Sequence, residues 1–301
     1  MFNTVSDLFF RRPKILTALL LAPPLAWITV VYIGSLLALL LQSFYHLDDF
    51  SGVILHEFTL STYAELFDQS DVQIISRTIT MAALVTLAAS VVAFPVAYYA
   101  ARFARGKWKA LFYIAVMMPL WSSYLVKIYA WKLILAKEGI VSWVASFLHI
   151  SWLLDALLSV PVIGGSSLSF SYIGTFLVFL YIWLPYMILP IQAALERVPH
   201  DYVEAAADLG ATQAQIFRGI LLPLALPGVV AGSIFTFSLT LGDYIVPQIV
   251  GNSRAMIGQA VYTLQGTAGD IPLAAAFTVV PMIIMGIYLT MAKRMGAFDA
   301  L

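Results

Sequence analysis

The sequence contains no cysteine, and only 11% of its 301 residues are charged. The absence of cysteine excludes disulfides, thiolate metal sites and a cysteine nucleophile. Acidic and basic residues balance at sixteen each, so the chain lacks the basic surface that neutralises nucleic-acid phosphates, and no nucleic-acid partner is predicted. Soluble domains carry roughly 25% charged residues. The composition therefore excludes a large soluble catalytic domain and indicates a membrane protein.

Hydrophobic residues make up 61% of the chain and the mean hydropathy is +0.92. They gather in six runs, each long enough to cross the ~30 Å of hydrocarbon in a bilayer. The runs are 15–44, 74–101, 110–131, 172–195, 224–249 and 272–292. Backbone amides in lipid must be paired within the segment, so each run is predicted to be a helix in contact with membrane lipid. The first run is too long for a signal peptide and is predicted to be retained. The predicted fold is all-α, with six transmembrane helices.

The distribution of positive charge predicts the orientation, because Lys and Arg near the ends of spans stay on the cytoplasmic side. With the N-terminus inside, eleven of the sixteen cations fall in cytoplasmic segments, including Arg11 and Arg12. The segment between the first two spans carries only acidic charges, as expected outside the cell. Both termini are therefore predicted to be cytoplasmic.

A long connection at residues 133–171 falls on the outside in this orientation. Apolar and polar residues alternate within 140–150, which favours a short helix lying in the plane of the membrane interface. Two roles stay open for this segment. It either packs on the outer ends of the helices as a lid or offers a docking surface.

The cytoplasmic connection at 196–222 holds the most specific motif of the chain. It reads Glu204-Ala205-Ala206-Ala207-Asp208-Leu209-Gly210, then nine residues, then Ile220-Leu221-Leu222-Pro223. Asp201 is a predicted N-cap, Glu204 falls in the first turn, and Gly210 ends the helix in a left-handed conformation. Thr212 is predicted to cap a second helix leading into the fifth span. The product is a short helix-turn-helix exposed to the cytoplasm.

This motif resembles, at every fixed position, the EAA signature of ABC importer permeases, which is Glu-Ala-Ala, three residues, Gly, nine residues, Ile-x-Leu-Pro. Two further segments are similar to the polyamine (spermidine/putrescine) branch of that family. They are Tyr181-Ile182-Trp183-Leu184-Pro185 in the fourth span and Leu241-Gly242-Asp243-Tyr244-Ile245-Val246-Pro247-Gln248 in the fifth. The terminal residues 296–301 extend the resemblance.

The resemblance implies a type I importer transmembrane domain in a bacterial inner membrane, divided into three parts. Residues 1–71 would hold a cytoplasmic segment, the first helix and an acidic external loop; 72–295 would form the permease core, with the coupling loop at 200–222; 296–301 would be a cytoplasmic tail. It also implies a dimer of ABC ATPase subunits, a second, homologous permease forming a heterodimer, and a periplasmic substrate-binding protein. The chain holds no phosphate-binding P-loop motif, so ATP and magnesium are assigned to the ATPase, and no cofactor or metal to this non-catalytic chain.

The family role in ATPase coupling transfers to six residues of the motif. They are Glu204, Ala205, Ala206, Asp208, Leu209 and Gly210. Alanine at 205 and 206 is small enough to let the helix backbone settle into a groove on another protein, while the carboxylate of Glu204 offers a charge to a basic partner.

Asp243 is the only acidic residue within a predicted span, about 24 Å along the helix from Pro227. Its carboxylate suits an ammonium group, and aromatic faces suit a cation. The candidate substrate path therefore consists of Asp243, Tyr244, Phe237, Trp183 and Tyr181. An alternative remains open, in which Asp243 pairs with backbone amides at a helix break beside Gly242 and the aromatic residues belong to the interfacial belt.

Structural roles are expected for three other features. Gly228 and Gly232 form a small-xxx-small pair, which predicts close packing of two helices. Lys127 and Arg77 lie near outer helix ends, where their side chains can reach the interface, although a place on the substrate path stays possible.

The function predicted from the resemblance is ATP-driven, binding-protein-dependent import of putrescine or spermidine by alternating access. Gamma-aminobutyrate or another small amine would suit the same architecture. An ion-coupled secondary transporter would be expected to carry midplane ionisable residues and paired broken helices. A membrane-embedded enzyme would need clustered acids, bases or metal ligands. The sequence shows neither pattern beyond Asp243 itself.

Overall fold

The computed structural model describes residues 13–48, 50–252 and 254–294. The predictions for Arg11, Arg12 and the tail at 296–301 lie outside these residues. The described chain is mostly helical. Its strands, β1 (His46–Leu47) and β2 (Ile54–Leu55), pair antiparallel with His46 opposite Leu55.

Among the residues that the structure describes, five helical segments are long and apolar enough to cross a membrane, which confirms the predicted polytopic helical fold. The first comprises α2 (Pro13–Trp27), a π-helical turn (Ile28–Ile33) and α3 (Gly34–Gln42). Two more are α5 (Gln69–Arg102) and α10 (Tyr172–Glu196). Another joins α12 (Gln213–Ile216), a π-helical turn (Phe217–Leu221) and α13 (Leu222–Gly242), and the last is α16 (Ile271–Arg294).

Shorter elements connect these segments. They are α4 (Ser61–Glu65), α8 (Ile140–Phe147), α9 (Ser151–Ser159), a 3₁₀ turn (Leu168–Phe170), α11 (His200–Asp208), α14 (Ile245–Ile249), α15 (Ile257–Thr263) and a π-helical turn (Leu264–Ala268). The helix predicted within 140–150 is thus present as α8 and ends at Phe147.

The third predicted span, 110–131, is wrong as a single helix. It consists of α6 (Lys107–Trp121) and α7 (Tyr124–Ile134), which are bent by 95° relative to each other. The ammonium of Lys127 donates to the backbone oxygen of Pro119 at 2.8 Å, so it satisfies a carbonyl in the last turn of α6. Carbonyls at the end of a helix have no intrahelical partner, which gives this lysine a structural role. Hydropathy does not reveal the bend because both halves are equally apolar.

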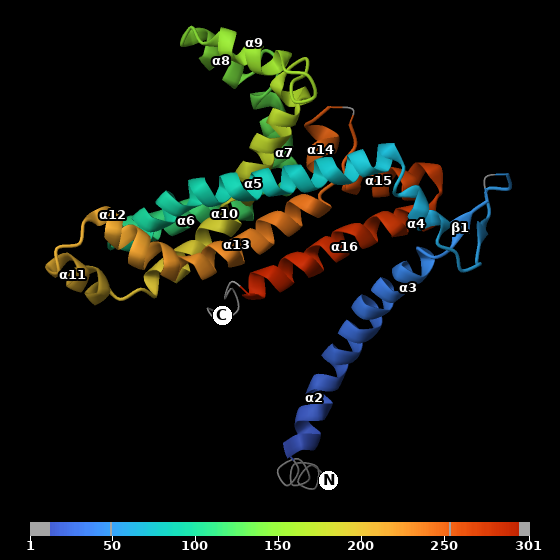
Figure 1. Cartoon of the computed structure of the whole chain (residues 1–301), viewed down its shortest axis with the longest axis horizontal. Helices are drawn as coiled ribbons and strands as arrows, with labels where there is room; N and C mark the ends of the chain where they lie inside the picture. The colour runs from blue at the N-terminus through green and yellow to red at the C-terminus, as the bar shows by residue number, and fades with distance from the viewer. Residues whose placement is uncertain (1–12, 49, 253, 295–301) are drawn as a thin grey trace.

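Three helices, α5, α10 and α13, form the core, and α16 lies alongside α13 (Figure 1). Small residues allow the close approach. Ala89, Ala93 and Ala97 of α5 are fully buried at a spacing of four residues. A Cβ added to Gly228 would lie 2.6 Å from the Cβ of Ala194, and one added to Gly232 would lie 2.8 Å from the sulfur of Met187. Both neighbours are on α10, so the prediction of close packing at these glycines is confirmed.

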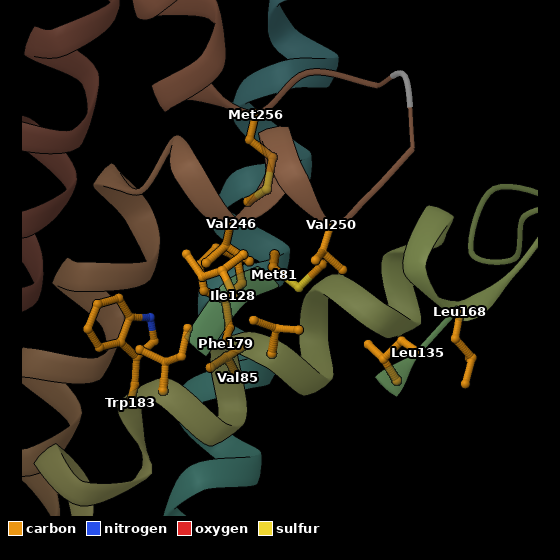
Figure 2. Packing of buried hydrophobic residues seen from close by; sticks show 12 residues of the cluster. Met81, Val85, Ile128, Leu135, Leu168, Phe179, Trp183, Val246, Val250 and Met256 are labelled. Carbon is orange, nitrogen blue, oxygen red and sulfur yellow. The ribbon is translucent and has the colours of Figure 1, made fainter. Parts of the chain in front are cut away.

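The two ends of the helical bundle differ. Figure 1 shows α11 and α12 at one end and α4, β1 and α15 at the other, while α2 and the α8–α9 pair project away from the bundle. Near the second end, a buried cluster joins α5, α7, α10 and α14 (Figure 2). It includes Met81, Ile128, Phe179 and Val246. The short elements around α7 and α14 are therefore packed against the core helices.

Replacement of Gly232 by leucine is expected to destabilise the protein by about 1–3 kcal/mol, because the new side chain overlaps Met187. Gly286→Leu is the matched control, since nothing lies within 4 Å of a Cβ placed there on α16. Thermal unfolding of the two purified variants measures the difference. Equal melting temperatures would contradict the close packing of α13 on α10.

Candidate functional site

The loop with the EAA motif, residues 200–222, begins with α11. This helix starts at His200, directly after Pro199 in an extended conformation. The prediction of Asp201 as N-cap is therefore wrong, and Glu204 lies in the second turn rather than the first. The physical reason is Pro199, which disfavours helical geometry at the residue before it and so fixes the start of the helix. Asp201 still lies in the first turn, where the helix dipole favours a carboxylate.

The C-terminus of α11 is closed as predicted. Gly210 has a φ of +81°, the left-handed conformation. Its N–H bonds the Ala207 oxygen at 2.9 Å, and the N–H of Ala211 bonds the Ala206 oxygen at 3.0 Å. This pair of bonds is a Schellman motif, which satisfies the last carbonyls of the helix. A residue with a side chain at 210 would be strained in this conformation.

The second helix of the loop is capped by Thr212, again as predicted. The Thr212 hydroxyl accepts from the Gln215 N–H, and the Gln215 side chain accepts from the Thr212 N–H at 2.7 Å. This capping box fixes the start of α12. From there the chain continues through a π-helical turn into α13 without leaving helical geometry. The loop is therefore joined directly to a core helix.

One face of α11 packs on the chain itself. Val203 and Ala206 lie against a buried cluster of Val198, Ile216 and Leu221. Ala206 is thus partly buried within its own loop and is not on the open surface. The other five motif residues predicted to contact an ATPase, Glu204, Ala205, Asp208, Leu209 and Gly210, are exposed. Leu209 is 89% exposed, although it is apolar.

Polar contacts at the base of the loop were missed from the sequence. Glu196, at the end of α10, accepts from Lys109 at 2.8 Å, from Tyr113 at 3.0 Å and from Gln192 at 3.2 Å. Two of these donors are on α6, so the carboxylate ties α6 to α10 just before the loop. The sequence does not indicate which distant residues a polar side chain at a helix end will contact.

Asp243 lies at the opposite end of α13. The helix ends at Gly242, so the predicted extension of the fifth span to residue 249 is wrong. One carboxylate oxygen of Asp243 accepts from the N–H groups of Ile245 at 2.8 Å and Val246 at 3.0 Å. The other accepts from the hydroxyl of Tyr124 on α7. The structure therefore shows the alternative in which Asp243 satisfies backbone amides at a helix break.

Aromatic rings extend from this carboxylate. The ring of Tyr124 stacks on Trp183 with centroids 5.9 Å apart, and Tyr186 meets the edge of Trp183 at 5.8 Å. Tyr244 stacks on Tyr262 of α15 at 5.1 Å. We call Asp243, Tyr124, Trp183, Tyr244 and Tyr262 the outer cluster, after the side of the membrane on which the charge distribution predicts it. A carboxylate has about four acceptor positions, of which Asp243 uses three, so capacity remains for another donor.

Two other predicted path residues lie elsewhere. Phe237 is 7% exposed and stacks on Tyr288 of α16 at 4.8 Å, within a different buried cluster. Tyr181 packs on Trp131 at 5.1 Å. Tyr124, by contrast, was missed. The sequence gives one signal that the apolar run 110–131 is interrupted before Tyr124, which is the polar pair Ser122-Ser123 that follows Pro119.

No group of three or more His, Asp or Glu side chains suited to a metal ion occurs among residues 13–48, 50–252 and 254–294. The geometry instead provides an exposed, well-capped loop at one end and a carboxylate with aromatic neighbours at the other. Neither region combines a nucleophile with a general base.

The bond between Tyr124 and Asp243 is expected to couple α7 to the end of α13. A double-mutant cycle with Tyr124→Phe and Asp243→Asn measures this coupling through the free energy of unfolding. A hydrogen bond to a carboxylate predicts about 1.5–3 kcal/mol. Tyr186→Phe is the control, because it removes a hydroxyl from a neighbouring ring that makes no hydrogen bond to Asp243. Additive effects of the two substitutions would contradict the bond.

Comparisons with known proteins agree on a family. Residues 93–295 match the model of the family described as binding-protein-dependent transport system inner membrane component. The chain is 55% identical over 297 residues to the inner membrane ABC transporter permease protein YdcU of Escherichia coli (strain K12), covering 99% of this chain and 95% of that protein. It is 29% identical over 269 residues to the spermidine/putrescine transport system permease protein PotB of Salmonella typhimurium (strain SL1344), covering 89% of each.

Solved structures show the same fold. A bacterial alginate ABC transporter, in complex with its alginate pentasaccharide-bound periplasmic protein, contains a chain that superposes with a TM-score of 0.73 at 16% identity, covering 96% of each chain. The family consists of membrane subunits of transporters, which are non-catalytic. The chain therefore belongs to the binding-protein-dependent transport system inner membrane components and is the inner-membrane permease subunit of an ABC importer.

Proposed function

We propose that this permease subunit imports polyamines, putrescine or spermidine, with energy from a separate ATPase that docks on α11. The observation that carries the proposal is the outer cluster, where a carboxylate with unused acceptor capacity lies beside aromatic rings. An ammonium group is attracted both to a carboxylate and to aromatic faces. The 29% identity to a spermidine/putrescine permease supports the same substrate class.

The proposed ATPase contact is the exposed face of α11. Tyr202 is 55% exposed and Leu209 89% exposed, so both large side chains are available to pack against a partner. Glu204 and Ala205 share the exposed surface of this short helix. The capped ends and the packed inner face hold α11 in one position relative to α12. Movement of the ATPase would therefore move both helices together. Magnesium and ATP belong to the partner subunit in this proposal.

Transmission from this contact follows the chain. The helix α12 passes without interruption into α13, whose far end is Gly242 beside Asp243. Movement of α11 toward an ATPase would therefore displace the helix that ends at the outer cluster. Alternating access then follows from two positions of α13 relative to its neighbours, selected by the state of the ATPase.

The remaining partners follow from the architecture. The proposed assembly contains a second, homologous permease, two ATPase subunits and a periplasmic binding protein that delivers the substrate. A solved transporter of the same fold was captured with a periplasmic protein, which supports the last of these. The EAA loop faces the cytoplasm in the proposed orientation, as do both termini. Residues 133–171 then face the periplasm.

Leu209→Asp is expected to abolish co-purification of the ATPase with the importer, because a charge replaces the exposed apolar contact. Phe67→Asp is the matched control, an 81% exposed apolar side chain at the opposite end of the molecule. Affinity purification through a tag on the permease, with quantification of bound ATPase, gives the result. Retention of the ATPase by Leu209→Asp would contradict docking on α11.

Uptake into proteoliposomes that contain the complete importer, with ATP inside, tests the substrate class. We expect accumulation of labelled putrescine or spermidine that depends on the binding protein. Asp243→Asn should lower the rate about tenfold, the effect of losing about 1.4 kcal/mol of interaction. Asp270→Asn is the control, because Asp270 also caps a helix, by accepting from the Leu273 N–H, and lies outside the outer cluster.

Three results would change the assignment. Uptake of gamma-aminobutyrate without polyamines would replace the substrate and leave the importer intact. Equal rates for wild type and Asp243→Asn would remove Asp243 from the path. Transport that continues without ATP hydrolysis would overturn the ATP-driven mechanism.

A further inference from the structure

A groove of about 830 Å³ runs along α5, on the face between α10 and the segment that follows α9. Its length is lined by apolar side chains of α5, including Leu84, Leu87 and Val91. At one end it is bordered by Leu157 of α9 and by Val162 and Ile163. The groove is separate from the EAA loop and shares no residue with the outer cluster.

The groove has four polar lining residues. Ser76, Arg77 and Thr80 lie on the first three turns of α5, and Tyr172 lies at the start of α10. The hydroxyls of Ser76 and Thr80 donate to backbone oxygens of α5, so their remaining capacity is to accept. Arg77 donates one bond, at 2.7 Å, to the side-chain oxygen of Gln73, and its guanidinium lies near the hydroxyl of Tyr172. No carboxylate in the described part of the chain lies within ion-pairing distance of Arg77.

A guanidinium has five N–H donors in a fork that matches phosphate geometry. Arg77 therefore retains donors and an uncompensated positive charge at the polar end of an apolar groove. From Arg77 to Val92 the helix extends about 22 Å, at 1.5 Å per residue, compared with the ~15 Å of one hydrocarbon leaflet. The groove thus has room for a headgroup contact followed by an acyl chain.

We propose that the groove binds an anionic phospholipid, with its phosphate at Arg77 and an acyl chain along Leu84, Leu87 and Val91. Along the groove, a cationic side chain is followed by apolar side chains. This order matches a phospholipid, in which an anionic phosphate is followed by an apolar acyl chain. A transmembrane helix of another protein would fill the apolar part equally well. It would, however, leave the charge of Arg77 buried without a counter-charge, which is costly.

A photoreactive residue in the groove tests this proposal. Benzoylphenylalanine replaces Leu87 in the complete importer, which is reconstituted into vesicles of equal phosphatidylglycerol and phosphatidylcholine. After irradiation, mass spectrometry identifies the adducts. The same substitution at Ile287 is the control, since this side chain of α16 is 59% exposed and reports the bulk lipid.

Phosphatidylglycerol adducts at position 87 should exceed phosphatidylcholine adducts about fivefold, the scale expected for one basic residue that faces an anionic headgroup. Position 287 should give the bulk ratio. Arg77→Gln should return position 87 to the bulk ratio, whereas Lys137→Gln, at an exposed lysine outside the groove, should not. A bulk ratio at position 87 in the wild type, adducts with another subunit, or enrichment that survives Arg77→Gln would each overturn the proposal.

Discussion

Every backbone N–H and C=O group within a bilayer needs a partner in the protein, so a helix that breaks there must have its free groups satisfied by side chains. Three breaks in the described part of this permease have such a side chain. Lys127 donates to the carbonyl of Pro119 beside the bend between α6 and α7, and Asp243 accepts from two amides after α13. Thr78 of α5 accepts from the N–H of Ile257 at the start of α15. These polar contacts, together with the buried cluster around Ile128 and Val246, hold the irregular end of the molecule opposite the EAA loop.

The two ends of α13 consequently differ in how they are connected to the rest of the chain. At the EAA loop, a Schellman motif and a capping box hold two short helices in fixed geometry, and helical conformation continues into the span. At the other end, Asp243 joins the broken chain to Tyr124 of α7 by a single side chain. In the proposed mechanism, a displacement that enters at the EAA loop reaches this carboxylate through α13.

The sequence predicts features whose cause is local. The conformation of Gly210 and the cap at Thr212 depend on residues within four positions, and Gly228 with Gly232 shows its packing role through spacing alone. The bend after Trp121 and the end of α13 at Gly242 are not predictable from hydropathy, because the apolar run continues across each break. The contact of Tyr124 with Asp243 joins residues 119 positions apart. Such a pairing exists only once the fold has formed.

The chain has no cysteine, so a single cysteine at Ala205 can be cross-linked without background. A short photoreactive reagent is attached to this cysteine in the assembled importer and couples on irradiation to whichever group lies beside it. Mass spectrometry then measures whether α11 contacts the ATPase. The account predicts an adduct between residue 205 and the ATPase, and loss of ATP-dependent uptake once it forms. An importer that hydrolyses ATP and transports substrate while residue 205 gives no ATPase adduct would contradict coupling through α11.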